Sequence, residues 1–241
     1  MNYSLTVITP TRDRPEAFDL CKKWMSRQTY ERLVQWIIVD DGDIPTSYTD
    51  NPKSNILAYS LRRNPSSDVC TLQDNLLHAI PHIQGECVLI FEDDEFYAPG
   101  YLSAMASMLD EAVLVGEKNA HYYNVASRRW HNSGNTTHAS LCRTGFRKSL
   151  IGAFRQICME SKRANDVFVD IRLWSTRTES RKLAEWSGLS VGIKGMPGRG
   201  GLGKSHALDA FRHKDPQMNV LRSWIGKADA AVYEKYYQRP K

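Results

Sequence analysis

Hydrophobic and polar positions along the first half of the chain alternate in blocks typical of buried strands and amphipathic helices. Pro15 opens a segment in which Ala17, Cys21, Trp24 and Gln28 recur every three or four residues, which predicts a helix with one face on the core. Similar helical spacing occurs in 71–80 and, beyond Pro99, at Leu102, Met105 and Leu109. Short apolar runs predict strands at 5–9, 34–39, 56–61, 87–91 and 112–116. Strands that alternate with helices predict an α/β fold with a mostly parallel central sheet flanked by helices.

The pattern is less regular in the second half. Residues 120–144 are expected to form a strand, a polar turn and a second strand, with Ser133, Gly134 and Asn135 as the hairpin turn. Helices are expected at 149–157 and 166–177, a last short strand at 189–195, and short helical pieces at 206–214 and 228–238. Without an internal repeat or a low-complexity linker, 1–241 is predicted to be a single domain with an irregular C-terminal region.

Composition narrows the class of protein. An apolar content of 41% over 241 residues suits one sizeable core. No apolar run approaches the roughly 20 residues of a membrane-spanning helix, and no secretory signal opens the chain, so a cytoplasmic protein without membrane insertion is expected. Five scattered cysteines fit reduced thiols, and the net charge of +5 weakly favours a polyanionic partner.

One stretch has the spelling of a nucleotide-binding P-loop. Residues 198–205, GRGGLGKS, contain the G-x-x-x-x-G-K-S pattern, in which Lys204 would reach a terminal phosphate and Ser205 would hold magnesium. In P-loop proteins this motif normally follows the first strand, but here the chain ends soon after it without another apolar strand. A P-loop nucleotidase is therefore an alternative, and a glycine-rich mobile loop is the preferred interpretation.

Acidic residues follow two of the predicted strands, in VDDGD (39–43) and FEDDE (91–95). Open α/β sheets bind ligands outside the carboxyl ends of their strands. Paired acids also form turns, which leaves that role open for Asp40 and Asp41. Four consecutive acids, however, repel one another unless a cation lies among them, and carboxylates suit Mg²⁺ or Mn²⁺.

Together with VITPTRDRP (7–15) and QTY (28–30), these segments resemble the family-2-like inverting nucleotide-sugar glycosyltransferases of the GT-A fold. The resemblance covers residues 5–102 well and extends more loosely to about 206. It implies a GT-A, Rossmann-like sheet whose 1–116 half binds the nucleotide sugar, with a UDP-sugar as the expected donor. Residues 117–241 would then form the acceptor side and the C-terminal loop and helices.

The resemblance also implies site residues. Glu92-x-Asp94 matches the family's D-x-D pattern, which makes Asp94 a ligand for Mn²⁺ or Mg²⁺ and leaves either Glu92 or Asp93 to approach the ribose. His206 is a candidate further metal ligand or an exposed helix-start histidine, and Lys204 would neutralise diphosphate charge. The residues expected to line the donor nucleotide are Thr9, Pro10, Thr11, Arg12, Asp40 and Arg63.

Inverting transfer is a single displacement that needs a general base for the acceptor hydroxyl. The family places this base in an acidic pair that opens a helix, and ANDVFVDIRLW (164–174) matches, with Asp166 as base and Arg172 as its support. Asp170 is the alternative, because residues four apart share one helix face.

The acceptor is the least constrained part of the sequence-based hypothesis. Basic clusters at 128–129, 143–148 and 177–182 could follow a phosphate backbone, and an extruded base could stack on Tyr122, Tyr123, Trp130 and His131. These features favour hydroxymethylated bases of DNA, as modified by phage-type glycosyltransferases, in which case the enzyme would act in the host cytoplasm. A saccharide or cell-envelope acceptor and a noncatalytic nucleotide-binding protein are the alternatives.

Overall fold

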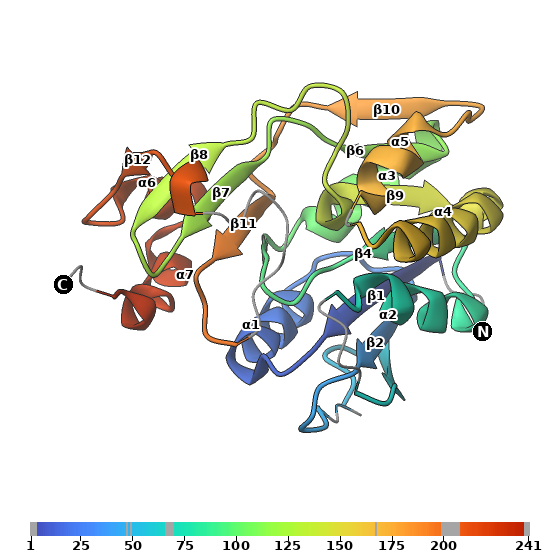
Figure 1. The fold of residues 1–241 in the computed structure, drawn as a ribbon, viewed down its shortest axis with the longest axis horizontal. Helices are drawn as coiled ribbons and strands as arrows, with labels where there is room; N and C mark the ends of the chain where they lie inside the picture. Colours follow the sequence, from blue (N-terminus) through green and yellow to red (C-terminus); the bar gives the residue numbers. More distant parts are fainter. Residues whose placement is uncertain are drawn as a thin grey trace.

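A seven-stranded sheet forms the centre of the structure (Figure 1). The computed structural model describes residues 4–46, 48, 50–65, 70–166, 168–198 and 208–238. In spatial order the strands are β10 (Arg181–Ala184), β6 (Leu114–Glu117), β9 (Thr144–Arg147), β4 (Cys87–Ile90), β1 (Leu5–Thr11), β2 (Val34–Asp40) and β3 (Ile56–Arg62). All run parallel except β9, which pairs antiparallel with β4 and β6. The predicted α/β architecture with a mostly parallel sheet is confirmed.

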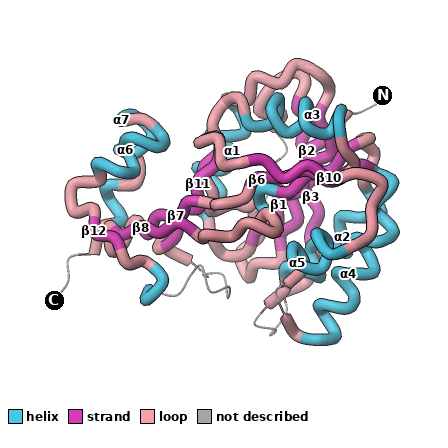
Figure 2. Tube along the Cα trace, turned by 90° about the horizontal axis from the view of Figure 1, so that it is seen from above, coloured by secondary structure: helices cyan, strands magenta, loops and turns pink. Residues whose placement is uncertain are grey.

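Helices cover both faces of this sheet (Figure 2). The alternation of side chains along β1 explains why: Val7 packs in one apolar cluster with Phe18, and Ile8 packs in the other with Leu76. A strand buried on both faces needs apolar residues at successive positions, which is what the short apolar runs provide. One face carries α1 (Pro15–Ser26) and α3 (Tyr101–Glu111); the other carries α2 (Leu72–Ala79), α4 (Ile151–Ala164) and α5 (Val169–Ser175).

A second, five-stranded sheet extends from the carboxyl edge of the large one (Figures 1 and 2). Its strands in order are β12 (His213–Lys214), β8 (Arg129–Asn132), β7 (His121–Asn124), β11 (Ser190–Lys194) and β5 (Phe96–Tyr97). Two helices, α6 (Asn219–Ile225) and α7 (Lys227–Ala231), contribute Leu221 and Ala230 to the apolar cluster that also holds Tyr123 and Ile193. Short 3₁₀ turns complete the described elements at Ile80–His82, Leu141–Arg143, Lys148–Leu150, Leu208–Ala210 and Glu234–Tyr236.

The second half is thus more regular than its sequence pattern predicts. The pattern does not predict strands β9, β10 and β12, because each is short and carries basic residues that mask the apolar signal. The strand at 190–194 is not the last one, and the helix expected at 206–214 is wrong within the described residues: Leu208–Ala210 is a 3₁₀ turn and His213–Lys214 is a strand. Non-local pairing decides these segments rather than local propensity.

The hairpin turn also lies elsewhere than expected. β7 pairs with β8 from His121 opposite Asn132 to Asn124 opposite Arg129, so residues 125–128 form the turn. The Ser127 N–H donates to Asn124 Oδ1 at 2.9 Å, and Arg128 ends the turn with a φ of 50°. The Ser133-Gly134-Asn135 cluster forms the following loop instead, where the Gly134 N–H donates to Asn132 Oδ1 at 2.9 Å.

Close packing of Gly85 against β1 generates a stability prediction. A Cβ on Gly85 would lie 2.5 Å from backbone atoms of Leu5 and Thr6, which cannot move without distorting β1. Gly85→Ala is therefore expected to lower the free energy of unfolding by about 1–3 kcal/mol in urea denaturation. Gly152→Ala is the matched control, because a Cβ there meets nothing within 4 Å and alanine suits helix α4. Equal stability of the two variants would contradict the packing argument.

Candidate active site

The carboxyl ends of β1, β2 and β4 converge because the three strands are adjacent and parallel. Thr11 lies opposite Asp40 in the register of β1 and β2, and the Asp41 N–H donates to the Thr11 carbonyl at 3.3 Å. The Thr11 hydroxyl also donates to Asp93 Oδ2 at 2.7 Å. The loop after β1, the loop after β2 and the acidic loop 92–95 after β4 therefore form one continuous surface, as expected for a ligand site in an α/β sheet.

Asp40 organises the loop that follows it. Its carboxylate accepts hydrogen bonds from the Gly42 N–H at 2.8 Å, the Thr46 N–H at 2.5 Å and Arg62 Nη1 at 2.9 Å. Both oxygens thus have partners within the protein, and the side chain is only 2% exposed. Asp40 therefore has the turn-forming role that the sequence analysis left open.

Asp41 and two arginines form the neighbouring part of the site. Asp41 Oδ1 accepts from Asn75 Nδ2 at 2.7 Å, while Arg63 Nη1 and Arg12 Nη1 approach its other oxygen at 3.5 and 3.7 Å. Arg63 in turn donates to Asn75 Oδ1 at 2.7 Å. The predicted residues Arg12 and Arg63 are therefore brought together at Asp41, and the Arg63 N–H donates to the Asp40 carbonyl at 2.9 Å.

The Thr9 side chain, in contrast, does not reach the surface of the site. Its hydroxyl is fully buried, accepts from Trp36 Nε1 at 2.9 Å and donates to the Phe91 carbonyl at 2.8 Å. It holds β1 against its neighbours, while the half-buried Pro10 lies in the strand between it and Thr11.

Two basic side chains that the sequence analysis did not assign to the acidic loop form ion pairs with it. Arg14 donates to Asp93 Oδ1 at 2.9 Å and to Asp94 Oδ2 at 2.7 Å. Lys194, the last residue of β11, donates to Glu95 Oε1 at 2.5 Å and to Asp94 Oδ2 at 3.3 Å. Burial works to lower the pKa of Lys194, but Asp94 and Glu95 outweigh it and raise that pKa, so the ammonium stays charged.

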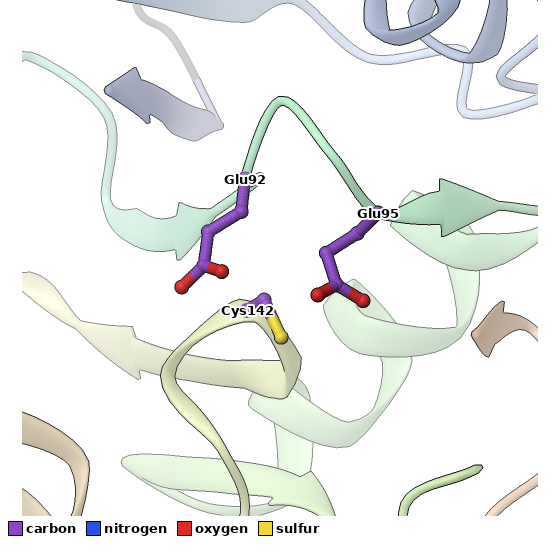
Figure 3. Close-up of side chains that lie close together, drawn as sticks. All are labelled: Glu92, Glu95 and Cys142. Atoms are coloured by element: carbon purple, nitrogen blue, oxygen red, sulfur yellow. The ribbon is translucent and has the colours of Figure 1, made fainter. Parts of the chain in front are cut away.

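Glu92 and Glu95 point from the acidic loop toward Cys142 (Figure 3). The nearest carboxylate oxygens and Cys142 Sγ all lie within 4.8 Å of one another. Burial, and then the nearby Glu95, raise the pKa of Glu92 to about 8; burial also raises the pKa of Asp93, to about 6, against the opposing effect of Arg14. The protein therefore compensates little of the charge at Glu92, where a cation would be favoured.

The donor set decides whether a divalent cation fits there. Glu95 Oε2 is buried without a hydrogen-bond partner among the described residues, and Arg143 Nη2 lies 3.7 Å from it. Carboxylate oxygens suit Mg²⁺ or Mn²⁺, whereas the Cys142 thiol does not, because burial raises its pKa and keeps it protonated. Glu92 and Glu95 fit a hard divalent cation, and Asp94 lies beside them in ion pairs with Arg14 and Lys194.

The two base candidates lie in different environments. Asp166 precedes α5, which begins at Val169, so it does not share a helix face with Asp170 as the sequence spacing suggested. Its carboxylate accepts from the Phe168 N–H at 3.0 Å and from Arg172 Nη2 at 2.6 Å. Desolvation works to raise the pKa of Asp166, but these two donors together lower it. Burial raises the pKa of Asp170.

The predicted glycine-rich loop lies mostly outside the described residues, and so do Lys204 and His206. Gly198, the last described residue before it, has a φ of 101°. A Cβ on Gly198 would lie 2.8 Å from the Asp13 carbonyl oxygen and 2.9 Å from Arg14 Cγ. Gly198 therefore packs against Asp13 and Arg14, and Arg14 in turn pairs with the acidic loop. The close contacts and the positive φ leave room only for glycine.

Several residues expected to contact DNA are buried in the structure. Arg143 is fully buried, lies 5.0 Å from the centre of the Tyr122 ring and faces Glu95. Tyr122 and Tyr123 are 6% and 0% exposed, and the Tyr123 hydroxyl contacts Asp215 at 3.2 Å. The expectation that Arg143 and Tyr123 contact a phosphate backbone or an extruded base is wrong, because both pack in the interior, whereas Tyr122 borders a pocket.

The buried position of Lys194 generates a prediction. Removing one partner of a buried ion pair leaves an uncompensated charge, so Lys194→Met is expected to lower the free energy of unfolding by about 3–5 kcal/mol in urea denaturation. Adding Glu95→Gln should restore part of this loss. The matched control is Lys182→Met, whose ion pair with Glu111 is exposed and should contribute less than about 1 kcal/mol. Similar effects of the two lysine substitutions would refute the structural role of Lys194.

Comparison with solved structures identifies proteins that have a similar fold. Among solved structures, S. aureus TarS 1–349 in complex with UDP-GlcNAc matches with a TM-score of 0.56 and 15% identity over 81% of this chain and 60% of that one. The crystal structure titled S. aureus TarS matches with a TM-score of 0.53 and 14% identity over 79% of this chain and 36% of that one. The chain thus spans well under two thirds of these proteins, and their low identity supports the fold alone.

Sequence comparison adds the family. No curated protein sequence matches the chain significantly. None of the described helices is long and apolar enough to cross a membrane. The model of glycosyl transferase family 2, however, matches residues 6–170, which include the converging strand ends, the acidic loop and both candidate bases. With more than half of its length matched and the expected GT-A arrangement of its sheet, the chain belongs to glycosyl transferase family 2.

Proposed function

We propose that this glycosyltransferase moves a sugar from a UDP-sugar to an acceptor hydroxyl with inversion at the anomeric carbon. The observation that carries the proposal is the convergence of Arg12, Arg63 and the acidic loop at the carboxyl ends of three parallel strands. A nucleotide diphosphate needs both positive side chains and a cation-binding carboxylate cluster, and this edge of the sheet offers both. The complex of TarS 1–349 with UDP-GlcNAc supports the choice of donor.

Residues 1–116 would bind the donor and residues 117–241 the acceptor. In this proposal the donor nucleotide lies along 9–12, the Asp40 turn and Arg63, with Glu92 or Asp93 beside the ribose. Asp40 acts by holding the loop 41–46 in place, since its oxygens already have partners. Lys204 would approach the diphosphate from the glycine-rich loop.

Asp94 would hold Mn²⁺ or Mg²⁺, with His206 as a further ligand and Glu92 and Glu95 beside it. When bound, the cation supplies positive charge at the departing diphosphate. Arg14 and Lys194 contribute to the same charge balance, because they already contact Asp94. The two basic side chains hold the acidic loop together and offset part of its negative charge before an anionic ligand binds.

Asp166 is the proposed general base and Asp170 the alternative. Arg172 and the Phe168 N–H hold the Asp166 carboxylate ionised and fixed in direction, as a base must be before it takes the proton of the acceptor hydroxyl. Asp170 lines a pocket near this segment and has a raised pKa, which suits a residue that binds the acceptor.

For the acceptor we propose a saccharide. The burial of Arg143, Tyr122 and Tyr123 withdraws much of the support for hydroxymethylated DNA, although the positive net charge and exposed arginines keep DNA as the alternative to be tested. A phage origin and action in the host cytoplasm depend on that alternative.

The donor assignment is tested with purified protein, a panel of UDP-sugars and ATP, with and without Mn²⁺. Slow Mn²⁺-dependent hydrolysis of a UDP-sugar is expected, because water replaces a missing acceptor. Asp94→Asn should abolish this hydrolysis in a protein that stays folded at the assay temperature, although loss of the ion pairs with Arg14 and Lys194 should lower its thermal unfolding temperature. Glu111→Gln at the exposed end of α3 is the control. ATP hydrolysis without UDP-sugar turnover would instead support the P-loop nucleotidase, and binding without turnover a noncatalytic protein.

The choice of base is tested by Asp166→Asn and Asp170→Asn. Loss of a positioned general base lowers the rate of transfer by roughly 10²–10⁴-fold, so Asp166→Asn should reduce kcat by this amount with unchanged affinity for the donor. Asp170→Asn should mainly raise the KM for the acceptor. A kcat loss of that size in Asp170→Asn alone would reverse the two roles.

A further inference from the structure

A polar pocket of about 580 Å³ lies beside the carboxyl end of β6. It is enclosed by that strand end, the β7–β8 hairpin, the loop 135–140, the start of α5 and the segment 210–213. The lining residues that matter for recognition are Glu117, Tyr122, His131, His138, Ser140 and Asp170. Its size lies within the range of about 300–1,000 Å³ typical of small-molecule sites.

Two buried polar atoms of the pocket lack partners among the described residues. Glu117 is 4% exposed; its Oε1 accepts from the Ser187 hydroxyl and from the Ser187 N–H at 3.2 Å, but its Oε2 has no hydrogen bond. His131 Nε2 is also buried without a partner. A buried carboxylate oxygen without a donor is costly, so a ligand hydroxyl that reaches either atom from the pocket would supply the missing hydrogen bond.

The surrounding packing fixes both groups in direction. The imidazole of His131 stacks on the Tyr122 ring, with ring centres 5.0 Å apart and planes 8° from parallel, and meets Phe211 edge-on at 4.8 Å. Ser187 holds Glu117. A site whose polar atoms are already oriented loses little entropy when a ligand binds.

Arg143 connects this pocket to the acidic loop. Its Nη1 donates to Ser140 Oγ at 3.0 Å, on the pocket side, and its Nη2 lies 3.7 Å from Glu95 Oε2. One fully buried guanidinium therefore borders both the pocket and the acidic loop. This position suits the second substrate of a transfer reaction.

We propose that this pocket is the acceptor subsite and binds one sugar unit of a saccharide, with Glu117 Oε2 and His131 Nε2 bonded to its hydroxyls. The inference rests on the proposed function. The acidic lining residues Glu117 and Asp170 are balanced by Lys118 and Arg212, so the pocket has no excess of positive charge for a polyanion. Closely spaced carboxylate, imidazole and hydroxyl groups match the donors and acceptors of an uncharged sugar.

Direct binding tests the pocket independently of catalysis. Saturation-transfer NMR with a panel of mono- and disaccharide glycosides, without donor, should show binding to the wild type. Glu117→Gln removes the charged acceptor, and His131→Phe keeps an aromatic ring for the stack. Each should weaken binding by roughly tenfold to a hundredfold, the effect of losing one hydrogen bond to a charged or fixed group. Glu111→Gln, at an exposed ion pair with Lys182, is the control, and thermal unfolding checks that each variant is folded.

Turnover separates this inference from the proposed function. Glu117→Gln and His131→Phe should each raise the KM for the acceptor by a larger factor than the KM for the UDP-sugar. Glu117-dependent saccharide binding by a wild type that turns over no UDP-sugar would support the pocket and reject the proposed function. Absence of saccharide binding, or binding equally strong in both folded variants, would overturn the inference. Binding of a hydroxymethylcytosine oligonucleotide in place of saccharides, lost in Glu117→Gln, would also overturn it and assign the pocket to an extruded base.

Discussion

The buried ion pairs between the acidic loop and Lys194 are the interaction on which the site depends, because they join the two sheets. The acids follow β4 of the large sheet, and Lys194 ends β11 of the small one. Neither partner is acceptable alone in the interior: unpaired carboxylates would take up protons, and an unpaired ammonium would lose one. The small sheet therefore does more than enlarge the core, since it supplies charge that lets four consecutive acids share one loop.

This arrangement also explains why the site has two distinct sides. Arg14 pairs with Asp93 and Asp94, and Lys194 pairs with Asp94 and Glu95, whereas none of the ion pairs between described residues reaches Glu92. The uncompensated negative charge is thus concentrated at Glu92, on the side of the loop next to Cys142. A cation or a ligand that enters the site meets a defined region of unmet charge rather than a diffuse negative surface.

Local patterns predict the first half of the fold well and the second half poorly, for physical reasons. β1, β2 and β4 are buried on both faces, so their apolar runs are unmistakable, and the acids at their ends indicate the site from the sequence alone. Arg14 lies within the motif that carries the family resemblance, and Lys194 is the one charge in an otherwise apolar strand, so both cations have a local signal. Arg143 has no such signal, because it is one of several basic residues in 143–148 and only the tertiary structure places it against Glu95. The turn at 125–128 escapes prediction because a stronger turn sequence lies only a few residues further on.

The position of β9 has a consequence for the order in which the protein is assembled during synthesis. β4 and β6 lie in the same sheet but do not pair with each other; β9, made after both, fills the space between them. A growing chain can therefore pair β1 with β2 and β4, and β2 with β3, but it carries an open edge at β4 until residues 144–147 leave the ribosome. During that interval Cys87–Ile90 presents unpaired backbone groups on an apolar strand, which is the kind of edge that invites pairing with other chains. Synthesis speed and chaperone access across this interval thus bear on the yield of folded enzyme.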